Sequence, residues 1–162
     1  MSHPSTEAAG DGSPSAFELV RYWGVVAAWM VIISMLSSDP FSASNTNRYI
    51  DPVLRFFFPD LTPSGFVFAH SVIRKTAHLS EFFVLGSLSY WASRRGRAPR
   101  WNIRWALQAL AISGGFALID EAHQHFIASR TGSLVDSAID FGGAVASVVV
   151  VYLRGRRVIG DR

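Results

Sequence analysis

Apolar residues are concentrated in four long stretches of the chain, and the segments between them are rich in charged and turn-forming residues. A helix of about 20 mostly apolar residues is long enough to cross the hydrocarbon core of a membrane, which is about 30 Å thick. We therefore predict four transmembrane helices, over residues 17–36, 63–92, 105–124 and 135–153. The fold class expected from this pattern is an all-α membrane protein.

The polar segments around these helices complete the predicted domain organisation. Residues 1–15 are rich in Ser, Pro and Gly and have no apolar pattern, so we predict a disordered N-terminal tail. The transmembrane domain then covers residues 16–154, and residues 155–162 form a basic cytoplasmic tail. In the first external loop, residues 54–58 form an aromatic-rich run between turn formers, and we predict a short interfacial helix there.

The basic residues indicate which side of the membrane each helix end faces. The net charge is +3, and nine of the fifteen Lys and Arg residues lie in two clusters, five in the 94–104 loop and four in the 154–162 tail. Cytoplasmic loops carry such an excess, so we expect a multi-pass cell-membrane protein with both termini in the cytoplasm. The clusters are better explained as anchors at a lipid surface than as a nucleic-acid interface. Seven aromatic residues fall at the same predicted interface: Tyr22, Trp23, Tyr90, Trp91, Trp101, Trp105 and Tyr152.

With this topology, the polar ends of the second, third and fourth helices all face outward. Ionisable groups at membrane depth are costly and usually functional. Arg74, His78 and Glu81 share one helix face at positions i, i+4 and i+7, and Asp136 and Asp140 share a face on the last helix. We therefore expect these groups to meet below the outer surface.

Small residues recur every four positions along the predicted fourth helix, at Ala138, Gly142 and Ala146. A face of this kind lets two membrane helices approach closely. We predict that this face packs against a neighbouring helix.

Three linked motifs carry a resemblance to a known family. They are Arg74-Lys75-x-x-His78-x-x-Glu81-Phe82 with Leu85-Gly86, then Asp120-Glu121-x-x-Gln124-x-Phe126, then Arg130-x-x-Ser133-x-x-Asp136-x-x-x-Asp140-x-x-Gly143. In the order and spacing of these motifs the chain resembles the VanZ-like family over residues 20–153. The resemblance implies a small four-helix bacterial membrane protein, in a family named for a member linked to resistance to the glycopeptide antibiotic teicoplanin. It implies no settled reaction.

The residue types indicate what such a site could bind. Lysine and arginine donors suit a phosphate or carboxylate, so we expect an anionic envelope lipid or a lipid-linked cell-wall precursor as ligand. The candidate ligand-binding residues are Arg74, Lys75, Gln124 and Arg130, and the candidate catalytic residues are His78, Glu81, Glu121, Asp136 and Asp140. Among the latter, His78, Glu81 and Glu121 would transfer protons. The two aspartates would orient Lys75 or Arg130.

Three other hypotheses remain open at the level of sequence. The same acids and bases could pair as a buried network that fixes helix register in a non-enzymatic scaffold. His78, Glu81, Glu121 and Asp136 resemble the ligands of helix-bundle metal sites, but the His-x-x-Glu order is reversed, so no metal or other cofactor is predicted. Intramembrane acids and a lysine also suit a small proton-coupled carrier, for which a homo-oligomer would have to complete the polar path.

The absence of cysteine excludes thiolate metal sites and cysteine nucleophiles.

Overall fold

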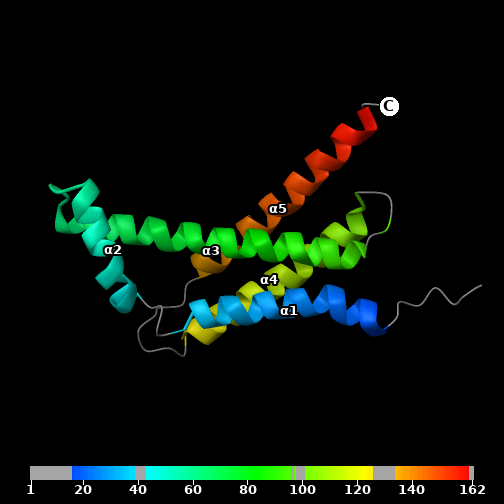
Figure 1. Cartoon of the computed structure of the whole chain (residues 1–162), viewed down its shortest axis with the longest axis horizontal. Coiled ribbons are helices and arrows are strands. Elements are labelled where there is room, and N and C mark those ends of the chain that lie inside the picture. Colours follow the sequence, from blue (N-terminus) through cyan, green and yellow to red (C-terminus); the bar gives the residue numbers. More distant parts are fainter. Residues whose placement is uncertain (1–15, 39–42, 96, 98–100, 126–133, 161–162) are drawn as a thin grey trace, which may run out of the picture.

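A computed structural model of the chain describes residues 16–38, 43–95, 97, 101–125 and 134–160. These residues form five α-helices and no strand, which confirms the all-α prediction (Figure 1). The helices are α1 (Ala16–Leu36), α2 (Ala43–Phe57), α3 (Pro63–Arg94), α4 (Ile103–His125) and α5 (Leu134–Gly160).

The long helices agree in position with the four predicted apolar stretches. The short helix expected at residues 54–58 is longer than predicted, because α2 begins at Ala43. The clearest difference is at the C-terminus, where α5 continues to Gly160 through most of the segment expected as a tail. The predicted disordered tail, residues 1–15, lies outside the described residues. Among the residues that the structure describes, Ala16–Leu36 and Leu134–Gly155 are long and apolar enough to cross a membrane. The other two long helices carry additional polar side chains, which lower their mean hydropathy: histidine and many hydroxyl groups in α3, and glutamine and histidine in α4.

Local sequence signals fix both ends of α3. Thr62 is the N-cap, and its hydroxyl accepts a hydrogen bond of 3.2 Å from the backbone N–H of Gly65. Pro63 follows at the first helical position, where its missing N–H costs nothing because that group has no partner within the helix. Arg95 ends the helix in the left-handed conformation, with φ of 49°.

The central helix is α3, which packs most extensively against α5 and also contacts α4, α1 and α2. Two glycines permit the close contact between α3 and α5. A Cβ on Gly143 would collide with the carbonyl oxygen of Leu79, and a Cβ on Gly86 would lie 3.0 Å from the Cα of Ala144. These glycines therefore allow the backbones of the two helices to approach each other.

The prediction of which small-residue face of the fourth helix packs against a neighbour was wrong. Ala138, Gly142 and Ala146 are exposed, and no atom outside the local helix lies within 4 Å of a Cβ built on Gly142. The face that packs contains Gly143 and Ser147, both buried and one position further along the helix. A shift of one residue rotates a helical face by about 100°. Residue size alone does not tell which of two neighbouring small-residue faces meets α3.

The aromatic residues predicted to share an interface gather at one end of the helices. Tyr22 of α1 lies 4.6 Å from Trp91 of α3, measured between ring centroids. At the same end, Trp101 lies 5.9 Å from Tyr90 and 4.9 Å from Tyr152. The end of α3, the segment before α4 and the later part of α5 therefore meet where both arginine clusters begin.

The described structure buries polar as well as apolar side chains, and it exposes many large apolar ones. The buried polar residues are Ser37, Ser89, Ser93, Ser113, Asp120, Glu121, Gln124, Ser137, Asp140 and Ser147. Every helix exposes large apolar side chains, for example Phe17, Phe56, Val67, Ile119 and Phe141. Exposed apolar surface on this scale needs an apolar partner, either lipid or protein.

Candidate functional site

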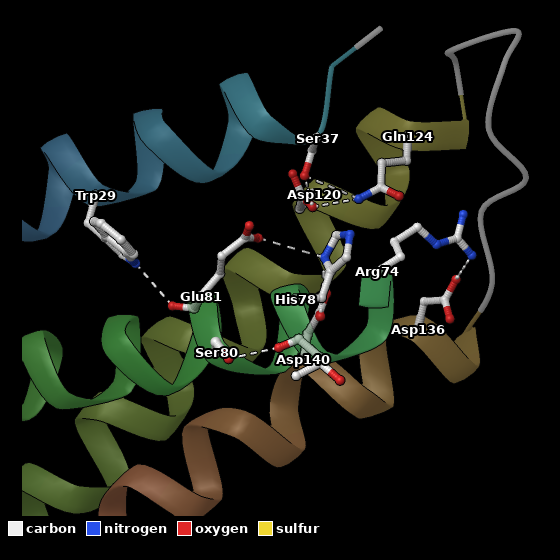
Figure 2. A network of polar contacts seen from close by, with 11 residues as sticks. Trp29, Ser37, Arg74, His78, Ser80, Glu81, Asp120, Gln124, Asp136 and Asp140 are labelled. Carbon is white, nitrogen blue, oxygen red and sulfur yellow. Dashed lines mark hydrogen bonds and ion pairs between the residues drawn. The ribbon is translucent and has the colours of Figure 1, made fainter. Parts of the chain in front are cut away.

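Three helices each contribute one ionisable side chain to a cluster inside the bundle. His78 of α3, Asp120 of α4 and Asp140 of α5 each offer a ligand atom within 4.8 Å of the other two (Figure 2). The Nδ1 of His78 lies 3.4 Å from Oδ1 of Asp140 and 4.0 Å from Oε2 of Glu81. Both aspartates are only 1% exposed. The cluster is therefore an acidic site around one imidazole.

The α3–α5 packing explains why His78 and Asp140 meet. Gly143 lies against the backbone at Leu79, which directly follows His78. Asp140 precedes Gly143 by three residues and so occupies the neighbouring turn of the same face of α5. The close helix contact at Gly143 thus places the Asp140 carboxylate beside the imidazole.

Asp120 is held by two donors that leave one of its oxygens available. The hydroxyl of Ser37, directly after α1, donates a hydrogen bond of 2.8 Å to Oδ2 of Asp120. The Nε2 of Gln124, one turn further along α4, donates a bond of 2.7 Å to the same oxygen. Figure 2 shows both donors on the side of Asp120 that faces α1 and the end of α4. The two bonds fix the orientation of the carboxylate.

Three buried polar atoms in the cluster lack a hydrogen-bond partner within the described part of the chain. They are Nδ1 of His78, Oδ1 of Asp120 and Oδ1 of Asp140. Buried polar atoms nearly always have such a partner. Their convergence indicates that the cluster is suited to interact with a further atom or ion.

Helix α1 also contacts the other side of the site. The indole Nε1 of Trp29 donates a hydrogen bond of 3.0 Å to the backbone carbonyl of Glu81. Val26 and Ile33, on the same face of α1, are buried in the apolar core with Phe82 of α3. This packing holds α1 against the turn of α3 that carries the site.

A small depression with positive charge at its edge opens next to the cluster. It is shallow and partly open to solvent, and it is lined by Arg74, Lys75, His78, Asp136, Ile139 and Asp140. One guanidinium nitrogen of Arg74 lies 3.7 Å from a carboxylate oxygen of Asp136. Lys75 is exposed and forms no hydrogen bond or ion pair within the described chain. Its ammonium group is therefore available to an anion from outside.

The structure brings most of the candidate residues together, but in different relations from those expected. Asp140 faces His78, and Asp136 faces Arg74, whereas both aspartates were expected to orient Lys75 or Arg130. Gln124 holds Asp120 and does not line the depression.

The remaining two candidates are Glu121 and Arg130. Glu121 is buried at 9% exposure on the helix that carries Asp120. Arg130 lies outside the described residues.

Asp120 and Ser37 are the residues that the sequence-based selection of the site missed. Asp120 carries a usable signal, because Asp120 and Gln124 are four residues apart and so share a helix face. Ser37 carries no such signal, since it follows an apolar helix that lacks any other residue of the site. Only its hydrogen bond to Asp120 in the folded structure shows its role.

The comparisons with known proteins identify the family. A family model described as VanZ/LLP1 matches residues 22–155, which is most of the chain and includes all of the cluster. The chain belongs to the VanZ/LLP1 family. No curated protein and no solved structure gives a match. Membership of VanZ/LLP1 confirms the resemblance found in the motifs, and together with the two apolar helices it indicates a membrane protein.

Proposed function

We propose that this VanZ-family protein crosses the membrane four times, through α1, α3, α4 and α5, with both termini in the cytoplasm. Support comes from the distribution of side chains, because all four helices expose apolar residues, and α3, α4 and α5 bury hydroxyl or charged ones. The amphipathic α2 suits a position along the membrane surface, with Arg48, Asp51 and Arg55 among its polar residues.

In this topology the acidic cluster lies nearer the outer surface than the inner one. His78 precedes Tyr90 by 12 residues, which is about 18 Å along an α-helix. If Tyr90 marks the inner interface, His78 lies beyond the midplane of a hydrocarbon core about 30 Å thick. The depression beside His78 therefore faces the outer leaflet.

We further propose that the depression binds the phosphate-bearing headgroup of an anionic envelope lipid or of a lipid-linked cell-wall precursor. The observation that carries this proposal is the exposed Lys75, beside Arg74 at the rim of a shallow depression. The acyl or prenyl chain would lie along the exposed apolar residues of the neighbouring helices. Val72 and Ile73, directly before the two cations, belong to that surface.

The arrangement of charges favours a binding site over a purely structural network. In a balanced network, the acids and bases would pair within the bundle. Here Asp120 and Asp140 are buried, whereas Arg74 and Lys75 are exposed. Among the described residues, Arg74 pairs with Asp136, and Lys75 pairs with no acid. The bases are therefore placed to meet a ligand.

The direct test is a lipid-binding measurement on the full-length protein in detergent. Native mass spectrometry would compare retention of phosphatidylglycerol and phosphatidylcholine with identical acyl chains. We expect the wild type to prefer phosphatidylglycerol, and Lys75→Gln to bind it roughly 10–100-fold more weakly, as expected for loss of a hydrogen bond to a charged group. Arg94→Gln, at the opposite end of α3, is the matched control. It removes only one of five basic residues in the 94–104 loop, so most of the preference should remain.

The same variants test the link to teicoplanin. Wild type, Lys75→Gln and Arg94→Gln would be expressed in a teicoplanin-sensitive host, and the amount of protein in the membrane would be quantified in the same cultures. We expect wild type and Arg94→Gln to raise the inhibitory concentration and Lys75→Gln to lose this effect at equal protein amount. Equal protection by all three would contradict a role of the depression in resistance.

A further inference from the structure

The cluster of His78, Asp120 and Asp140 has the composition of a metal-binding site. It combines one imidazole and two carboxylates, which are common ligands of zinc and of related divalent transition metals. Their ligand atoms lie within 4.8 Å of one another and come from three different helices. A zinc ion binds such ligands at about 2.0–2.2 Å, which places neighbouring ligand atoms roughly 3–3.5 Å apart. A movement of about 1 Å, within the reach of side-chain rotation, would bring all three to bonding distance.

Buried polar atoms without hydrogen-bond partners also indicate a metal site, independently of the distances between the ligand atoms. Each of the three residues has one buried nitrogen or oxygen without a hydrogen-bond partner among the described residues. Asp120 and Asp140 are 99% buried, and no lysine or arginine of the described chain pairs with either of them. Two buried carboxylates need a compensating positive charge. A divalent cation supplies that charge and occupies the three free atoms together.

We propose that His78, Asp120 and Asp140 bind a divalent transition-metal ion of the zinc type. Three protein ligands leave at least one coordination position open, as in catalytic rather than purely structural zinc sites. His78 and Asp140 also line the depression, so the open position faces the place proposed for the anionic headgroup. The metal site does not depend on the lipid proposal, because it can be measured with the metal ion alone.

The neighbouring residues support this assignment. Ligands in metal sites are oriented by hydrogen bonds to surrounding groups. The carboxylate of Asp120 has this arrangement, since Ser37 and Gln124 both donate to Oδ2 and leave Oδ1 for the ion. The open depression beside His78 provides the path by which an ion can enter.

The test uses full-length protein in detergent, stripped with a chelator and then equilibrated with Zn²⁺, Mn²⁺ or Mg²⁺. After gel filtration, bound metal is measured by inductively coupled plasma mass spectrometry. We expect the wild type to retain about one Zn²⁺ per chain and to release it on chelation, and Mg²⁺, which prefers oxygen ligands, not to be retained. His78→Gln and Asp140→Asn should weaken zinc binding by more than roughly 100-fold, beyond the effect typical of losing a supporting hydrogen bond.

The chain offers a matched control pair. His70 of α3 and Asp51 of α2 form another histidine–aspartate contact, at 2.6 Å, away from the cluster. His70→Gln and Asp51→Asn should therefore leave zinc retention unchanged. Retention that falls equally in the control and cluster variants, or that persists in His78→Gln and Asp140→Asn, would overturn the proposal.

A measurement on the wild type alone covers the case in which the cluster variants fail to fold. X-ray absorption at the zinc edge reports the elements around the ion and their distances. We expect one imidazole nitrogen and carboxylate oxygens at about 2.0–2.2 Å. A wild type that retains no zinc, or whose zinc has more than one imidazole ligand, would contradict the assignment.

Discussion

Adjacent glycines of α5 should differ in their response to alanine. A Cβ on Gly142 meets no atom within 4 Å outside its local helix, whereas a Cβ on Gly143 would collide with the carbonyl oxygen of Leu79 and lie 3.1 Å from the backbone N of Phe83. Both substitutions gain helix propensity, worth up to about 1 kcal/mol. Only Gly143→Ala adds a clash with backbone atoms. Overpacking of this kind lowers the free energy of unfolding by about 1–3 kcal/mol. Because the propensity gain is common to both, Gly143→Ala should be less stable than Gly142→Ala by about 1–3 kcal/mol.

Thermal unfolding of the two variants and the wild type, purified in the same detergent, would measure this difference. For a chain of this size, 1 kcal/mol corresponds to about 2–4 °C in Tm. We expect Gly142→Ala at or above the wild-type Tm and Gly143→Ala about 2–12 °C below Gly142→Ala. Equal Tm values for the two variants would refute the conclusion that α3 and α5 touch at Gly143, and with it the explanation of how His78 and Asp140 meet.

Three further substitutions test other contacts. Trp29→Phe removes the hydrogen bond to the carbonyl of Glu81 while keeping an aromatic ring, and should lower the unfolding free energy by about 0.5–1.5 kcal/mol in the same assay. Ser37→Ala removes one of two donors to Asp120 and should weaken zinc binding by about 10–100-fold, measured by metal titration; unchanged affinity would show that Ser37 does not orient the carboxylate. His70→Ala breaks the contact that joins α2 to α3 and should increase proteolysis within α2, whereas Ser71→Ala, whose hydroxyl bonds only within its own helix, should not.

Much of the fold follows from the sequence because apolar stretches of helix length are a strong signal. The four predicted stretches correspond to α1, α3, α4 and α5, and the cap of α3 at Thr62-Pro63 is readable from residue type. The aromatic residues near the arginine clusters were also grouped correctly, since both signals mark the same helix ends.

The pairing of individual helix faces could not be predicted in the same way. Hydropathy does not specify rotation when a helix is apolar on most of its surface, so the contact face of α5 was assigned one residue too early. The site shows the same limit. Its helices and most of its ionisable residues were identified, but Asp120 was passed over in favour of its neighbour Glu121, because adjacent residues on a helix point about 100° apart. The structure places Asp120 between Ser37 and His78.

The central claim is that the polar site of this VanZ-family protein opens to the outer side of the membrane. Because the chain has no cysteine, single cysteines can be introduced without a background of other thiols. Intact cells that express Lys75→Cys or Arg94→Cys would be treated with a membrane-impermeant maleimide, before and after permeabilisation. We predict that Lys75→Cys is labelled in intact cells and that Arg94→Cys is labelled only after permeabilisation. Labelling of Arg94→Cys but not Lys75→Cys in intact cells would place the site on the cytoplasmic side and contradict the proposed function.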